Sequence, residues 1–126
     1  MRITIVAFAV LFVSQVAVAG PEHSHRQIIP AAAHVEGLDG SEWQTDVVIH
    51  NPTNVAVHVG VWLYPRDWQG DHRGVEWIIG PRETRMFPDA WNRVYWSSPS
   101  SSGWMRFEAS NDEGHPAPIV VDSRTY

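Results

Sequence analysis

The sequence predicts an all-β fold, namely an antiparallel two-sheet sandwich of about seven strands with immunoglobulin-like topology. Three observations support this class. Apolar and polar residues alternate over short stretches, which is the pattern of a half-buried strand. Clusters of Gly, Pro, Asn and Asp separate these stretches, and no run of about a dozen residues keeps its apolar positions at helical spacing. The 126-residue chain has room for one such domain, and a small barrel is the alternative arrangement.

The first segment, residues 1–19, is predicted to be a secretory signal peptide. Arg2 gives it a positive start, Ile3–Val13 forms a largely apolar core, and the small residues Ala17 and Ala19 suit a signal peptidase, so we expect cleavage after Ala19. The apolar core is shorter than the ~20 residues that span a bilayer. We therefore expect a secreted protein, periplasmic or extracellular, with no membrane span after the signal is cleaved.

The rest of the chain is predicted to consist of a flexible N-terminal arm, residues 20–27, and a β-sandwich domain, residues 28–126. The clearest strand covers residues 55–64, where alternate residues from Val55 to Leu63 are apolar and form a core face. The predicted strands, in chain order, are Ile28–His34, Gln44–His50, Val55–Tyr64, Val75–Ile79, Glu83–Phe87, Trp104–Ala109 and Pro118–Tyr126.

The segments between the strands carry turn and loop signals. Residues 51–54, Asn-Pro-Thr-Asn, predict a turn between two strands. Residues 88–96 are predicted to contain one helical turn with Asp89 as its cap, and residues 97–102 to form a flexible loop rich in serine.

Composition excludes several function classes. The chain has no Cys, so it can form no disulfide, thiolate metal site or thiol nucleophile. Its nine basic residues are all Arg and face 14 acidic ones, which gives a net charge of −5. A basic nucleic-acid-binding surface is therefore not expected.

No catalytic or metal-binding constellation emerges from the spacing of polar residues. His23 and His25 flank one residue of the predicted arm and could chelate a metal weakly, and residues 111–114 favour a turn over a calcium loop. The serines of residues 97–102 lie in the predicted loop, and no G-x-S-x-G motif occurs. We therefore expect no enzyme, no cofactor and no metal.

Tryptophan is in excess. The chain has seven Trp, all after the predicted signal peptide, which is more than one small core usually holds. Packing explains most of them, but exposed indoles also stack on sugar rings or anchor protein partners. The candidates for ligand binding lie on the face opposite the valines, or in or beside predicted loops: Trp62, Tyr64, Trp68, Trp91 and Trp96.

The last predicted strand carries a charged residue that needs a partner if it is buried. Arg124 shares a face of this strand with Val120, Asp122 and Tyr126, and Asp46 lies in an early strand. We expect Arg124 to pair with Asp46 or with Asp122, because a half-buried guanidinium needs a carboxylate. A solvated Arg124 near the chain end is the alternative.

Four short motifs together resemble a known group. They are Ile29–His34 (IPAAAH), residues 40–46 with the pattern Gly-Ser-x-Trp-x-Thr-Asp, Asn51-Pro52-Thr53, and Ser123–Tyr126 (SRTY). In this order they resemble a group of uncharacterised exported bacterial domains with a C-terminal Ser-Arg-Thr-Tyr strand. The resemblance covers residues 29–126 and implies an immunoglobulin-like β-sandwich in an extracellular setting. It implies no catalytic or ligand-binding residues.

These observations lead to one expectation about function and one alternative. We expect an exported, non-enzymatic β-sandwich that acts as a structural or interaction module with an unknown protein or glycan partner. The alternative is a carbohydrate-binding module that uses its exposed Trp and Tyr side chains.

Overall fold

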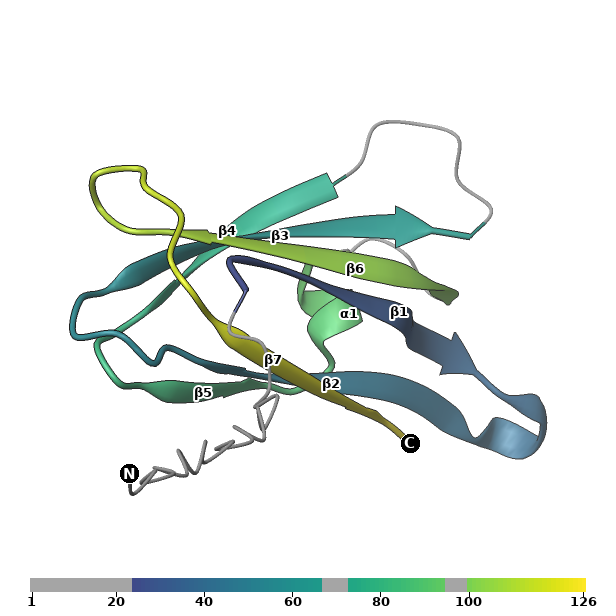
Figure 1. The fold of residues 1–126 in the computed structure, drawn as a ribbon. Helices are drawn as coiled ribbons and strands as arrows, with labels where there is room; N and C mark the ends of the chain where they lie inside the picture. Colours follow the sequence, from purple (N-terminus) through teal and green to yellow (C-terminus); the bar gives the residue numbers. More distant parts are fainter. Residues whose placement is uncertain (1–23, 67–72, 95–99) are drawn as a thin grey trace, which may run out of the picture.

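The computed structural model describes residues 24–66, 73–94 and 100–126 (Figure 1). It confirms an all-β fold with seven antiparallel strands. The strands are β1 (Arg26–Glu36), β2 (Glu42–His50), β3 (Val57–Pro65), β4 (Arg73–Ile79), β5 (Thr84–Phe87), β6 (Ser101–Ser110) and β7 (Val120–Thr125). A 3-10 turn, Leu38–Gly40, links β1 to β2, and the short helix α1 (Ala90–Val94) follows β5.

All seven predicted strands are present, with shifted ends. Strand β1 begins at Arg26, and Ser24 forms an isolated bridge with Ile119, so the last residues of the predicted arm belong to the sheet. Strand β6 begins at Ser101, inside the segment predicted as a loop. Strand β3 begins only at Val57, and Val55 is 52% exposed, so the prediction of Val55 as a core residue is wrong.

Hydrogen bonding joins the strands into one sheet in the order β4-β3-β6-β1-β2-β5, with β7 also paired to β2. Strand β2 makes this continuity possible, because residues 42–44 pair with β1 while residues 45–50 pair with β5 and β7. The sheet therefore has two halves, β4-β3-β6-β1 and β5-β2-β7, which are joined because β2 pairs with strands of both (Figure 1). All seven strands are therefore joined by hydrogen bonds through β2.

The hydrophobic core draws side chains from both halves of the sheet. Val57, Val59, Val61 and Leu63 of β3 are fully buried, as the alternation predicts. Other fully buried core side chains are Val47, Ile49, Ile79, Met105, Phe107 and Ile119. Trp77 of β4 stacks on Phe87 of β5, with ring centroids 3.8 Å apart, and so connects the outermost strands of the two halves.

Asn51 anchors the predicted turn after β2. Its side chain is fully buried, and its Nδ2 donates to the carbonyl oxygens of Val55 (2.7 Å) and Gly80 (2.8 Å). Its Oδ1 accepts from the backbone N–H of Thr53 at 2.9 Å. One buried amide therefore hydrogen-bonds to backbone groups of two turns and links them.

Side-chain hydrogen bonds connect residues of two of the motifs, in β2 and at the end of the chain. The Thr45 hydroxyl accepts from the N–H of Ala33 at 2.9 Å and lies 2.8 Å from the Thr125 hydroxyl. The Tyr126 hydroxyl donates to Oδ2 of Asp46 at 2.9 Å. The threonines, Asp46 and Tyr126 of the resembling motifs are thus occupied in holding β7 against β2.

The expected ion pair of Arg124 is not formed within the described residues. Arg124 lies opposite Asp46 in the β2–β7 pairing, but the Asp46 carboxylate already accepts from Tyr126 and from the N–H of Asp89. Arg124 is exposed, and its guanidinium lies 5.5 Å from the centroid of the Tyr126 ring. A solvated guanidinium needs no carboxylate partner, which explains the difference.

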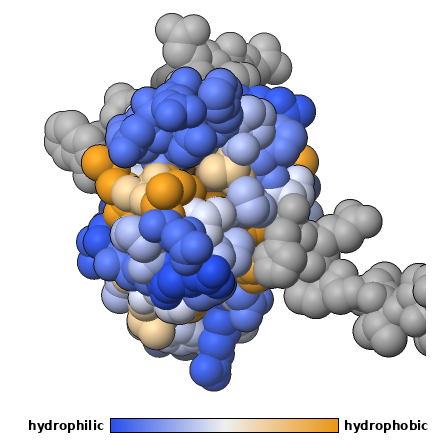
Figure 2. Space-filling model, turned by 60° about the vertical axis from the view of Figure 1, so that its left-hand side comes forward, coloured by the Kyte–Doolittle hydropathy of each residue, from blue (hydrophilic) through white to orange (hydrophobic). Residues whose placement is uncertain are grey.

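The surface mixes polar and apolar residues. On the face in Figure 2, hydrophobic residues are confined to small areas between hydrophilic ones. Large exposed apolar side chains are spread over several elements: Ile28, Leu38, Trp43, Val55, Ile78, Met86, Trp104 and Tyr126. In the three described ranges, no helix has the length and apolar character needed to cross a bilayer.

Candidate functional site

The outer face of the β4-β3-β6-β1 half carries the candidate site. Alternation in β3 buries the odd-numbered residues and turns the even-numbered ones, from His58 to Tyr64, outward. The cross-strand neighbours of these outward residues on β6 also point outward, and we call the combined surface the outer face. Its residues on β3 and β6 are His58, Gly60, Trp62, Tyr64, Trp104, Arg106, Glu108 and Ser110.

Trp62 lies across the backbone of two strands. A Cβ atom at Gly60 would overlap its indole ring, and a Cβ atom at Gly74 would lie only 2.9 Å from indole Nε1. Gly74 is the cross-strand neighbour of Trp62 on β4, and Gly60 precedes it on the same face of β3. The two glycines therefore provide the space in which the indole lies on the sheet.

Three further side chains continue from Trp62 along the outer face. The guanidinium carbon of Arg106 is 4.6 Å from the Trp62 ring centroid and 5.6 Å from that of Tyr64, within cation–π range. Tyr64 stacks on Trp104, with centroids 3.7 Å apart and planes 2° from parallel. We call Trp62, Arg106, Tyr64 and Trp104 the aromatic row.

Arg106 is held mainly by the rings beside it. Its Nε atom is buried and has no hydrogen-bond partner in the part of the chain that the structure describes. The guanidinium lies near the rings of Trp62 and Tyr64, whose negative faces attract it. Arg106 thereby links the two aromatic side chains of β3.

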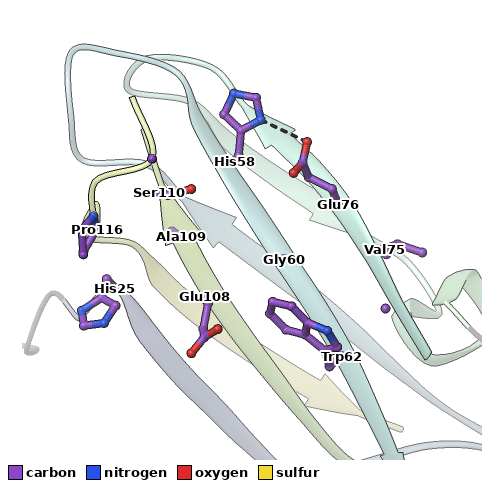
Figure 3. Close-up of a pocket in the computed structure, with 12 residues that line it drawn as sticks. His25, His58, Gly60, Trp62, Val75, Glu76, Glu108, Ala109, Ser110 and Pro116 are labelled. Carbon is purple, nitrogen blue, oxygen red and sulfur yellow. Dashed lines mark hydrogen bonds and ion pairs between the residues drawn. The ribbon is translucent and has the colours of Figure 1, made fainter. Parts of the chain in front are cut away.

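A groove of about 660 Å³ adjoins Trp62, and we call it the Trp62 groove. Figure 3 shows His58 and Trp62 at its two ends, with Gly60 between them. Glu76 lies on one side of the groove, and Glu108 and His25 lie on the other. The groove combines an aromatic surface with polar groups that can exchange hydrogen bonds with a ligand.

The carboxylates beside this groove have cationic partners. Glu108 forms an ion pair with Arg26. Nδ1 of His58 lies 3.0 Å from Oε1 of Glu76, and its Nε2 lies 2.6 Å from Oδ1 of Asp112. The hydrogen bond to Glu76, followed by that to Asp112, raises the pKa of His58 above its ordinary value of 6.5, since only the imidazolium donates from both nitrogens.

A second groove, of about 620 Å³, adjoins the other end of the aromatic row, and we call it the Trp104 groove. Trp104 and Tyr64 line it together with Pro30, Ala31 and Ala33 of β1. The β1–β6 pairing shifts register between Ile29 and Ala32, so residues 30 and 31 lie outside the regular ladder. Trp104 is 36% exposed, which leaves part of its ring accessible beside these small residues.

The predicted binding residues fall into three groups. Trp62 and Tyr64 lie together on the outer face, both partly exposed. Trp91 is 1% exposed and its Nε1 donates to the Ser101 hydroxyl at 2.5 Å, so its assignment as an exposed ligand-binding residue is wrong: helix α1 turns it into the core. Trp68 and Trp96 lie outside the described residues.

Sequence reasoning missed Trp104 and Arg106 as members of the site. Residues 104, 106 and 108 alternate with the buried residues Met105, Phe107 and Ala109. This alternation places them on one face, but their alignment with Trp62 and Tyr64 depends on the register between β3 and β6.

A second cluster of titratable residues lies around His34. Its Nδ1 is 2.9 Å from Oδ2 of Asp89, and its Nε2 is 3.5 Å from Oε1 of Glu42. Ser101 lies opposite His34 in the sheet, but its hydroxyl accepts the Trp91 indole N–H. Asp89 adopts a positive φ of 48° before α1, and its carboxylate and His34 link that turn to β1.

Within the described ranges, no group of three or more His, Asp or Glu side chains is arranged to hold a metal ion. Of the two histidines considered for metal binding, His23 lies outside those ranges and His25 borders the Trp62 groove. In the loop of residues 111–114, Oδ1 of Asn111 accepts from the N–H groups of Glu113 and His115, and Gly114 has a φ of 80°. Asn111 thus stabilises a turn.

Comparison with protein families, with curated proteins and with solved structures finds no match to this chain.

Proposed function

We propose that the protein is an exported, non-enzymatic β-sandwich module of immunoglobulin-like topology that binds a partner through its outer face. The aromatic row is the observation that carries this proposal. Trp62, Tyr64 and Trp104 lie on the outside of the sheet, where Arg106 contacts Trp62 and Tyr64 and where Tyr64 stacks on Trp104. Aromatic and arginine side chains of this kind are enriched where proteins bind partners.

The sandwich arrangement is supported by the distribution of the core. Buried side chains of β3 and β6 and those of β2 belong to one hydrophobic cluster, as expected when the two halves of a sheet face each other. The resemblance of the four motifs supports the immunoglobulin-like topology. The apolar core and small residues of segment 1–19 support export.

The non-enzymatic character is supported by how the polar groups of the His34 cluster are used. The Ser101 hydroxyl accepts from Trp91 at 2.5 Å, and among the described residues no hydrogen bond joins it to the imidazole of His34. Nucleophilic catalysis by serine requires a hydrogen bond between these two groups. The arrangement is that of a structural link between β1, β6 and α1.

Carbohydrate binding is the second candidate, and the setting of Trp62 favours it. The indole covers the backbone of Gly60 and Gly74, so one of its faces is against the sheet. A flat aromatic surface bordered by hydrogen-bonding groups suits a sugar ring, which presents apolar C–H groups on its face and hydroxyls at its edge. His58, Glu76 and Glu108 border the groove beside it.

The test is an intrinsic-fluorescence titration of residues 20–126 against a panel of soluble glycans, with Trp62→Ala beside it. Trp43→Ala is the matched control, because Trp43 is 52% exposed and lies in β2, away from the aromatic row. Saturable binding that Trp62→Ala abolishes and Trp43→Ala retains would support the carbohydrate candidate.

A flat titration by folded protein would remove the carbohydrate candidate and leave a protein partner. Loss of a protein partner by Trp62→Ala, but not by Trp43→Ala, would then support the outer face as the interaction surface. Turnover of a substrate by the pure protein would contradict the non-enzymatic proposal.

A further inference from the structure

We infer that the outer face takes an extended, uncharged linear polysaccharide, with one sugar ring stacked at Trp62 and another at Trp104. This inference rests on the carbohydrate-binding candidate and specifies the ligand's length and charge. It adds Trp104 as a second stacking residue and Arg106 as the residue that positions the aromatic row.

The length follows from the positions of the two grooves. The Trp62 groove extends to His58, and the Trp104 groove includes Tyr64 and Pro65. The six residue steps along β3 from His58 to Tyr64 span about 20 Å at the usual rise of a strand. A single sugar ring occupies one groove only, whereas a linear chain along β3 reaches both.

The two ends offer different aromatic surfaces. Trp62 lies on the sheet over glycine backbone, with the Arg106 guanidinium 4.6 Å from its ring centroid. The part of the indole away from Arg106 borders the Trp62 groove. Trp104 has one face covered by Tyr64 at 3.7 Å, so its accessible part faces the groove formed with Ala31 and Ala33. These small side chains leave room for a ring against the indole. Two aromatic surfaces on one pair of neighbouring strands are expected where a protein binds consecutive sugar units of one polysaccharide.

Charge decides which class of polysaccharide fits. The chain carries a net charge of −5, and Glu76 and Glu108 border the Trp62 groove with Asp112 bonded to His58 at its end. These carboxylates repel an acidic polymer. Because His58 and Arg26 already pair with them, they are not isolated charges that require a cationic ligand. Carboxylates held in this way accept hydrogen bonds from sugar hydroxyls.

Arg106 links the two subsites without belonging to either groove. Its guanidinium lies 4.6 Å from the Trp62 centroid and 5.6 Å from the Tyr64 centroid. Loss of this side chain removes one contact from each of the two rings, and we expect it to weaken binding at both ends. Arg106→Lys keeps the charge but lacks the planar guanidinium, so it should bind less well than the parent and better than Arg106→Ala.

The experiment is isothermal titration of the chain with β-1,4-linked gluco-, manno- and xylo-oligosaccharides, from the disaccharide to the hexasaccharide. We expect the hexasaccharide of the preferred series to bind at least about tenfold more tightly than its disaccharide, because the second contact is intramolecular. Trp62→Ala and Trp104→Ala should each abolish this gain, while Trp104→Tyr retains part of it and Trp43→Ala all of it. Thermal melting shows whether each variant is folded.

Four results would overturn the inference. Equal affinity for the disaccharide and hexasaccharide, or a hexasaccharide affinity unchanged by Trp104→Ala, would show a single subsite while glycan binding itself stands. Tighter binding of oligogalacturonate than of every neutral series would show an acidic ligand. No binding of any series by folded protein would overturn both the inference and the carbohydrate candidate.

Discussion

Trp91 and Trp62 are the same residue type in opposite situations. Trp91 is 1% exposed and its indole N–H donates to Ser101, so both its apolar and its polar parts are used by the fold. Trp62 lies outside the core, over Gly60 and Gly74, with Arg106 beside it. The comparison distinguishes aromatic residues that are buried in the core from aromatic residues that remain accessible to a ligand.

The same division extends to the surroundings of the two indoles. The core that contains Trp91 also includes buried polar groups with specific partners, such as Thr45 and Asn51. The aromatic row makes ring and cation contacts on the outside of one sheet half. We therefore expect substitutions in the first region to cost stability, and substitutions in the second to cost binding.

The largest contrast is between the two alanine variants. Trp91→Ala removes a large, fully buried side chain, and we expect it to lower the free energy of unfolding by about 3–5 kcal/mol. Trp62→Ala removes an exposed cation–π contact and some surface packing, so we expect a loss of only about 1 kcal/mol. Urea unfolding monitored by circular dichroism measures both, and similar losses for the two variants would break the comparison.

The next effect concerns the buried amide of Asn51. Asn51→Ala removes one of the donors to the carbonyl groups of Val55 and Gly80 and the acceptor of the Thr53 N–H, and we expect a loss of about 1–3 kcal/mol. Asn54→Ala is the control, because Asn54 is exposed and only accepts from Arg82. Thermal melting of the two variants is sufficient: a control that melts as low as Asn51→Ala would contradict the anchoring role of Asn51.

The strands were predictable from the sequence because their signals are local. Alternation in residues 55–64 and the Asn-Pro-Thr-Asn turn before them depend only on neighbouring residues. The shared pairing of β2 was not predictable, because it depends on which residues of β1, β5 and β7 meet it. The joining of the two halves through β2 could therefore not be derived from local patterns.

The candidate site was only partly predictable, for the same reason. Trp62 and Tyr64 follow from the alternation of β3, but Trp104 joins them only through the β3–β6 register. Trp91 lies beside turn residues in the sequence. The helical turn that contains it was predicted, but the sequence does not indicate that this turn directs Trp91 into the core. Burial of a side chain in a short helix depends on tertiary packing that no local pattern encodes.

A subtler effect should appear at the glycine beneath Trp62. Gly60→Ala places a methyl group where the indole lies, so the ring must shift, and we expect glycan binding to fall several-fold with a stability loss under about 1 kcal/mol. Gly80→Ala is the control, since its nearest neighbour would be Glu83 Oε2 at 3.6 Å, an ordinary contact. Unchanged binding by Gly60→Ala would show that the indole's position on the sheet does not matter.

The smallest effect is the pH dependence at the end of the Trp62 groove. The pKa of His58 is raised above 6.5 by Glu76 and Asp112, so the stabilisation from its charged form is full below 6.5 and is lost as pH rises through the higher folded-state pKa. His58→Gln should remove this part of the pH dependence. Titration of the His58 ring signals by NMR gives its pKa directly, and a value at or below 6.5 would contradict the pairing.

The most direct test of the division between core and outer face is an NMR titration that follows the indole Nε1–H signals of the seven Trp as a β-1,4-linked hexasaccharide of the preferred series is added. The account predicts that the signals of Trp62 and Trp104 shift in a saturable manner and that the signal of Trp91 does not. Absence of any shift, or shifts centred on Trp43 and Trp91 with Trp62 and Trp104 unchanged, would contradict it.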